Sequence, residues 1–154
     1  SRAAQTKINA LHERALRITY NAYYSTFEEL LEKDGSVTIH INNIRKLLIE
    51  IYKVLNKLGN NSFSELFQLY NSNYNLRTIK DLKVPSINTV WKGENSIRFF
   101  GAKLWNLLPS EIKNAKSLYV FKTKIKNRLP LDCPCRLCKI YINGVGYNFK
   151  LKNL

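Results

Sequence analysis

The sequence predicts a mainly helical α+β protein, and two observations carry that prediction. Along much of residues 1–75 apolar side chains recur at spacings of three and four, as they do on one face of a helix. β-Branched and aromatic residues then become common, and the segments "INTVW" and "SIRFF" flank "KGEN", which is typical of a β-hairpin with a four-residue loop. The length of 154 residues suits one ordinary domain with a real core.

The first half of the chain is expected to begin with two helices. A helix over residues 3–20 is predicted from an apolar face made of Ile8, Leu11, Ala15 and Ile18. A shorter helix is expected over residues 27–33, because Thr26 and Glu29 have the spacing of a capping box. Gly35 is the expected stop of that helix.

The most regular pattern of the chain lies in residues 38–58. Its apolar side chains alternate at spacings of three and four: Ile41, Ile44, Leu48, Ile51, Leu55 and Leu58. This spacing predicts an amphipathic helix that ends at Gly59. Ser62 and Glu65 repeat the capping-box spacing and predict a further helix over "SFSELFQLY".

After the predicted hairpin, in which Gly101 ends the second strand, two more helices are expected. "AKLWNLL" is predicted to be a short helix stopped by Pro109. Ser117 is the expected cap of a basic helix, "LYVFKTKIKNRL", with a buried edge formed by Leu118, Phe121, Ile125 and Leu129.

The tail is expected to hold a small terminal hairpin around Asn143–Gly144. The predicted organisation therefore has three parts: residues 1–75, residues 76–130 and a cysteine-bearing tail of residues 131–154.

The charge of the chain points to a polyanionic partner. The net charge is +14, and residues 78–154 hold fifteen Lys or Arg against four Asp or Glu. Nucleic acid is the commonest partner of such a domain, and the alternative is a charge that serves solubility alone. Like charges four residues apart, such as Lys122 and Lys126, cost a helix some stability, and a phosphate backbone would relieve that cost.

Tyr119 lies beside these lysines and is a candidate for stacking on bases. The predicted nucleic-acid contacts are Lys113, Lys116, Lys122, Lys124, Lys126, Arg128, Arg136 and Lys139. The alternative for this set is a basic face that only meets water.

All three cysteines of the chain lie close together in "CPCRLC", as Cys133, Cys135 and Cys138. Such a cluster is a candidate ligand set for Zn²⁺, and the basic neighbours Arg136 and Lys139 favour the thiolate form. A closed site needs a fourth ligand from outside the cluster. Two alternatives stay open: reduced cysteines in a packed turn, and a redox pair of Cys135 and Cys138.

Catalysis finds no support in the sequence. No glycine-rich phosphate loop, nucleophile elbow or His-Glu-x-x-His motif is present. No secretory signal or run of about 18 apolar residues is visible, so we expect an intracellular protein, in the nucleus or cytoplasm, with no membrane contact. His12 and His40 are expected to be ordinary structural histidines, with His40 a possible zinc ligand if the fold brings it close.

Four blocks of the chain resemble, in order, the carboxyl end of the reverse transcriptases of non-LTR (LINE-like, jockey-type) retrotransposons. The blocks are "KINALHERALRITYN", "FEELLEKDGSVTIHINNIRKLLIEIYKVLN", "NTVWKGENSIRFFGAKLWNLLPSEIKNAKSLYVFKTKIKNRLP" and "CPCRLCKIYI". Together they span about residues 7–142, and the "LWNLLPSEIK" block with the "CPCRLCK" run is the most specific part. None of them is a catalytic signature.

The resemblance implies a fragment that follows the polymerase palm. Ile8–Tyr20 and Thr38–Leu58 would belong to a thumb-like helical block that clamps a template–primer duplex, and these helices would expose apolar surface. Lys113–Lys139 would belong to a basic tail that holds template RNA or target DNA. The palm aspartates and endonuclease residues of the family are missing here, so the fragment is expected to be non-catalytic although its parent polyprotein would be an RNA-directed DNA polymerase.

The cysteine run departs from the Cys-Cys-His-Cys pattern of related zinc-knuckle tails, which leaves the metal open. A different class of function also stays open: a protein-interaction module in which the apolar helix of residues 38–58 docks a partner helix.

Overall fold

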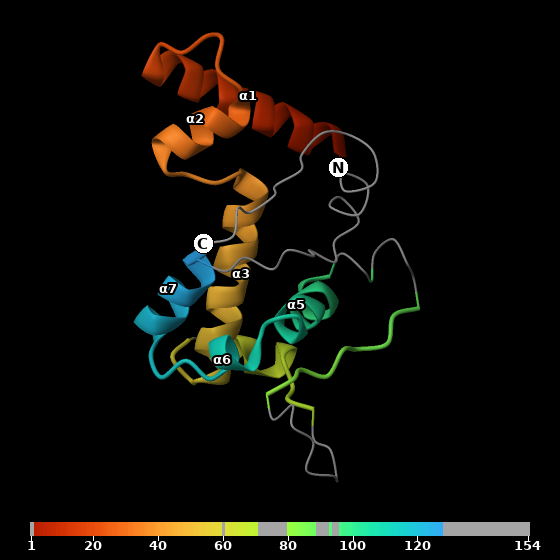
Figure 1. The fold of residues 1–154 in the computed structure, drawn as a ribbon. Helices are drawn as coiled ribbons and strands as arrows, with labels where there is room; N and C mark the ends of the chain where they lie inside the picture. The colour runs from red at the N-terminus through yellow and green to blue at the C-terminus, as the bar shows by residue number, and fades with distance from the viewer. Residues whose placement is uncertain (1, 60, 71–79, 89–92, 94–95, 128–154) are drawn as a thin grey trace. The chain divides into compact units, whose positions relative to one another are not determined.

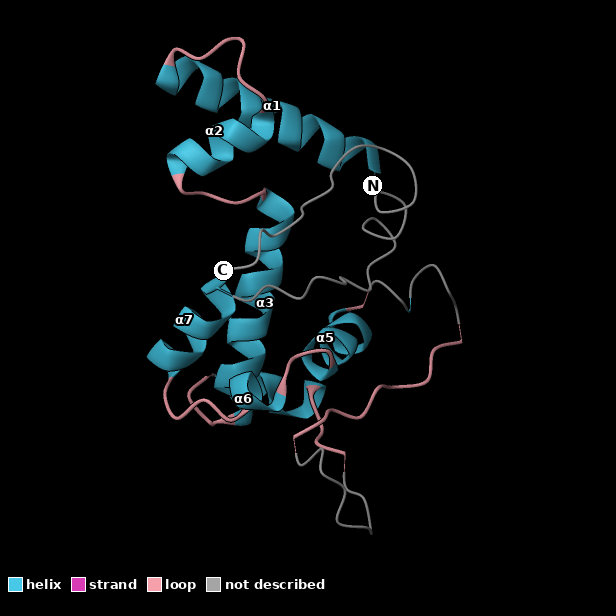
Figure 2. Cartoon of the chain, viewed as in Figure 1, coloured by secondary structure: helices cyan, strands magenta, loops and turns pink. Residues whose placement is uncertain are grey.

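The computed structural model describes residues 2–59, 61–70, 80–88, 93 and 96–127. The described chain is built from helices joined by loops, as Figures 1 and 2 show, and it contains no strand in these residues beyond an isolated bridge. The mainly helical prediction is therefore confirmed. The chain divides into two compact units, residues 1–46 and residues 47–154.

The first unit is formed by α1 (Arg2–Tyr20), α2 (Phe27–Asp34) and the beginning of α3 (Ile39–Leu55). The capping box before α2 is present, since the Thr26 hydroxyl accepts from the Glu29 backbone N–H and the Glu29 carboxylate accepts from the Thr26 backbone N–H. Gly35 ends α2 in the left-handed region, at a φ of +65°. Both ends of α2 are thus where the sequence predicts them, because each depends on residues close in the chain.

The core of the first unit lies between α1 and α2. It consists of Leu16, Phe27, Leu30 and Leu31, with Tyr20 and Ala22 packed against it. The apolar face that predicts α1 lies elsewhere on that helix. Ile8, Leu11 and Ile18 are 44%, 66% and 62% exposed.

The second unit contains the rest of α3, the 3₁₀ helix η1 (Asn61–Leu66), α5 (Ile97–Asn106), α6 (Ser110–Lys113) and α7 (Leu118–Asn127). Its core includes nine of the ten largest fully buried side chains of the described chain, all but Leu30: Leu48, Ile51, Tyr52, Leu82, Leu104, Trp105, Ile112, Phe121 and Ile125. Every helix of this unit except η1 contributes to that list, so the buried surface is shared among all of them.

The predicted β-hairpin is wrong at its second strand, because "SIRFF" is the beginning of α5. The Ser96 hydroxyl accepts a hydrogen bond from the Phe99 backbone N–H, at 3.3 Å, which caps the helix. Phe99, Ala102 and Trp105 are all buried, and their spacing of three continues the helical pattern through the segment. Most of the first predicted strand, "INTVW", lies outside the described residues.

Gly101 has a different role from the strand ending that the sequence predicts. It lies inside α5, where a Cβ atom added to it would come within 3.0 Å of Phe67 and 3.1 Å of Ile51. The absent side chain thus lets the helix approach its neighbours closely.

The helix predicted over "SFSELFQLY" is shorter and tighter than expected, since only Asn61–Leu66 is helical and it is a 3₁₀ helix. The chain then forms an antiparallel bridge between Leu69 and Leu82. The Asn106 carboxamide pairs with the Leu82 backbone, accepting from its N–H at 2.8 Å and donating to its carbonyl at 2.9 Å. The helix ends early because Gln68, Leu69 and Tyr70 form this bridge with the segment around Leu82 and do not continue the helix.

Part of the predicted organisation concerns residues that the structure does not describe. The terminal hairpin around Asn143–Gly144 lies outside the described residues. The division at residues 75 and 130 stays a prediction. Among the helices that are described, none has the length and apolar character to cross a lipid bilayer.

Candidate nucleic-acid interface

The basic helix α7 is anchored by aromatic packing on its inner side. Phe121 and Ile125 are buried. The Phe121 ring stacks on Tyr52, with centroids 4.2 Å apart and planes at 22°, and it lies 5.8 Å from the ring of Trp105. The Tyr52 hydroxyl donates to the carbonyl of Ala115 at 2.8 Å, which ties down the segment that leads into the helix. These contacts fix which side of α7 faces outward.

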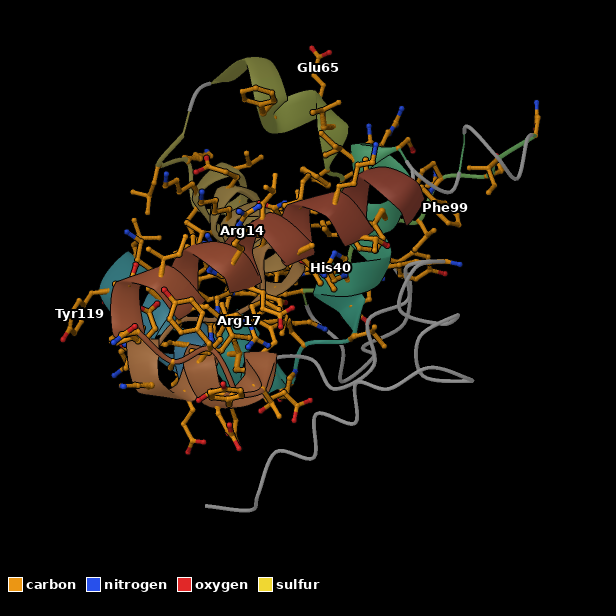
Figure 3. The ribbon with its side chains drawn as sticks, turned by 90° about the horizontal axis from the view of Figure 1, so that it is seen from above. Arg14, Arg17, His40, Glu65, Phe99 and Tyr119 are labelled. Carbon is orange, nitrogen blue, oxygen red and sulfur yellow. The ribbon has the colours of Figure 1, made fainter. Side chains whose placement is uncertain are left out.

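The outward side of α7 combines an aromatic ring with ammonium groups. Tyr119 is 78% exposed and points away from the ribbon in Figure 3. Lys122, Thr123 and Lys126 follow it at spacings of three, four and seven, so they share its face, and all three are exposed. Ser117 caps the helix by accepting from the Val120 backbone N–H at 3.3 Å. We call Tyr119, Lys122, Thr123 and Lys126 the α7 face.

Two other predicted contacts lie beside this face. Lys116 is exposed in the turn just before α7. Lys124 lies on another side of the helix, where its ammonium donates to the carbonyl of Glu111 at 2.9 Å. The lysines that alternate in the sequence therefore lie on different sides of α7, with Lys122 and Lys126 on the α7 face and Lys124 outside it.

Lys113 is placed differently from the other predicted contacts, because it is buried. Its ammonium lies 2.7 Å from the Asp81 carboxylate and donates to the Asn106 carbonyl at 3.1 Å. The side chain is only 8% exposed, which gives it a structural role in the second unit. No local pattern indicates this pair, since its members lie 32 positions apart in the chain.

The remaining predicted site residues lie outside the described residues: Arg128, Cys133, Cys135, Arg136, Cys138 and Lys139. Zinc binding by the cysteines therefore stays a prediction. Within the described ranges no three His, Cys, Asp or Glu side chains gather as metal ligands would. His12 packs edge-on against the Phe27 ring, with centroids 5.6 Å apart, in the core of the first unit.

Comparison of the chain with protein-family models, with curated proteins and with solved structures gives no match.

Proposed function

We propose that this chain is a non-catalytic nucleic-acid-binding module from the carboxyl-terminal region of a non-LTR retrotransposon reverse transcriptase. The α7 face is the observation that carries the proposal. It presents an exposed tyrosine ring for base stacking and, beside it on the same face, two exposed lysines that could contact a phosphate backbone. The excess of Lys and Arg in residues 78–154 and the order of the family-like sequence blocks both support it.

A purely structural role for the same lysines has a clear physical basis. Lys124 and Lys126 lie in the last turn of α7, where positive charge interacts favourably with the helix dipole. That role predicts a change in helix stability on substitution and no change in nucleic-acid affinity. The two roles are therefore separable by measurement.

The experiment is a salt titration of binding to a single-stranded RNA and to a DNA duplex, each with a fluorescent label. Each phosphate contact contributes about 0.7 to 0.9 to the slope of log K against log salt concentration. The double variant Lys122→Gln/Lys126→Gln is expected to lower that slope by about 1.5 and to weaken binding to every sequence alike. Tyr119→Ala is expected to weaken binding to the single strand about tenfold with little change in slope.

Lys124→Gln is the matched control, because it removes the same charge from the same helix outside the α7 face. If Lys124→Gln lowered the affinity and the salt slope half as much as the double variant does, the binding would reflect general charge attraction. That result would count against the α7 face. Binding that is weak and independent of salt in all proteins would reject nucleic-acid binding itself.

In the alternative function, the helix of residues 38–58 docks a partner, but Leu58 is the only residue of its predicted apolar face that is mostly exposed, at 59%. Leu48, Ile51 and Tyr52 are at most 2% exposed, so the apolar side of this part of α3 is occupied by the core. We therefore do not adopt α3 as a docking helix.

A further inference from the structure

The exposed apolar residues of α1 form a narrow stripe. Ile8, Leu11, Ala15 and Ile18 are separated by three, four and three residues, which is the spacing of the a and d positions of a heptad. We call these four residues the α1 stripe. All four are exposed, while the core of the first unit uses Leu16 from a different side of the same helix.

The width of the α1 stripe favours a helix as its occupant. A stripe restricted to a and d positions is the seam of a coiled coil, whereas an apolar face that covers a globular core or lies in a membrane surface is wider. The chain also places no aromatic side chain within the stripe. An amphipathic helix laid along α1 would cover it.

The charges beside the α1 stripe indicate which charges the docked helix would carry. Lys7 and Arg14, seven residues apart, lie along one edge of the stripe and both are exposed. The only carboxylate of α1 is Glu13, which lies on the far side of the helix and is paired with Arg17 at 2.7 Å. Figure 3 shows Arg14 and Arg17 on this helix. The edge of the stripe is thus positive without a compensating acidic residue on α1.

A second copy of the chain would be a poor occupant. An antiparallel pair of α1 helices would bring Lys7 of one copy close to Arg14 of the other, and two chains of net charge +14 repel each other.

We propose that the α1 stripe docks an amphipathic helix of a partner protein that carries acidic residues beside its own apolar seam. This inference goes beyond nucleic-acid binding, since it uses a different unit of the chain and a different chemistry.

The probe for this surface is a synthetic peptide of about three heptads, with Leu at a and d and Glu at e and g. The comparison peptide has the same sequence with Lys in place of Glu. By fluorescence anisotropy with the whole chain, we expect a Kd of roughly 10 to 100 µM for the Glu peptide, because the stripe is short. The Lys peptide is expected to bind at least about tenfold more weakly, because it meets Lys7 and Arg14 with like charge.

Two variants test the seam and its edge separately. Leu11→Ser/Ile18→Ser is expected to lower affinity for the Glu peptide about tenfold or more, and Ala15→Glu, which keeps a good helix former, should do the same. Lys7→Glu/Arg14→Glu is expected to reverse the preference between the two peptides. Ile97→Ser is the control, since Ile97 is 59% exposed on α5 and should leave peptide binding unchanged.

Five results would overturn the proposal, and four of them concern the α1 stripe directly. These four are equal affinity for both peptides, unchanged binding by the seam variants while circular dichroism shows them folded, self-association of the free chain that Leu11→Ser/Ile18→Ser abolishes, and binding to phosphatidylserine vesicles in place of the peptide. Loss of peptide binding in Lys122→Gln/Lys126→Gln would equally reject it, since that variant should alter nucleic-acid binding alone. The two proposals can therefore fail independently.

Discussion

The ammonium of Lys113 lies 2.7 Å from the carboxylate of Asp81, and the two side chains are 8% and 25% exposed. The ion pair joins α6 to the segment that bridges Leu69, two parts of the second unit that are distant in sequence. Because the Lys113 ammonium also donates to the Asn106 carbonyl, most of its hydrogen-bonding capacity is used inside the protein. A lysine that the sequence places among nucleic-acid contacts thus stabilises the fold.

Replacing Lys113 with Met is expected to lower the free energy of unfolding by about 2 to 3 kcal/mol. Removing one partner from a fully buried pair costs roughly 3 to 5 kcal/mol, and Asp81 retains some access to water, which reduces the loss. Urea unfolding followed by circular dichroism measures it. The control is Lys53→Met, which breaks an exposed pair with Glu50 and should change stability by less than about 0.5 kcal/mol. Equal effects in the two variants would contradict a structural role for Lys113.

Replacing Gly101 with Leu is expected to lower the free energy of unfolding by about 1 to 3 kcal/mol. Leucine is the better helix former by nearly 1 kcal/mol, so any loss must come from packing. The new side chain would meet Phe67 and Ile51, whose atoms already lie 3.0 and 3.1 Å from the position of its Cβ. Arg98→Leu adds the same residue at an exposed position of α5 and should have little effect. If both variants were as stable as the parent, the inferred close packing of Phe67 and Ile51 against Gly101 would be contradicted.

The hydrogen bond from the Tyr20 hydroxyl to Asp34, at 2.8 Å, predicts a dependence of stability on pH. Polar contact with Ser36 and the bond from Tyr20 lower the pKa of Asp34 below its ordinary value of 3.8. The bond to Asp34 raises the pKa of Tyr20 above 10.0. The Asp34 contribution is therefore present above about pH 4 and is lost as the pH falls, whereas the Tyr20 contribution is present below about pH 10 and is lost as the pH rises.

Tyr20→Phe removes this bond, and its melting temperature should lie furthest below that of the parent between about pH 5 and pH 9. The difference should shrink toward about pH 3 and again above about pH 10. Thermal unfolding across this range provides the measurement. Tyr23→Phe serves as the control, because the Tyr23 ring is 60% exposed. A Tyr20→Phe difference that stays constant with pH would count against the coupling.

The sequence predicts elements well where their signals are local. The capping box at Thr26, the glycine stop at Gly35 and the Ser117 cap all depend on residues within four positions, and all are present in the structure. The buried edge of α7 at Phe121 and Ile125 follows from the same short-range periodicity. The ends of α2, the cap of α7 and the buried side of α7 were therefore predictable from neighbouring residues.

Features that depend on distant contacts were not readable in this way. The burial of Lys113 depends on Asp81, and the close packing at Gly101 depends on Phe67 and Ile51. "SIRFF" has strong β propensity, which the burial of Phe99 in the core of the second unit overrides, although the Ser96 cap is itself a local helix signal. Periodicity also identifies an apolar face on α1 without saying whether the fold covers it, since that depends on which partner lies beside it.

The carboxamide of Asn106 occupies the place that a third strand would take beside Leu82. The backbone at Asp81 and Lys83 bonds to Tyr70 and Gln68 on one side, and the Asn106 side chain bonds to Leu82 on the other. An open strand edge is a template on which other chains can add and aggregate. By using both backbone groups of Leu82, a single side chain from a helix leaves neither of them open to pairing with another chain.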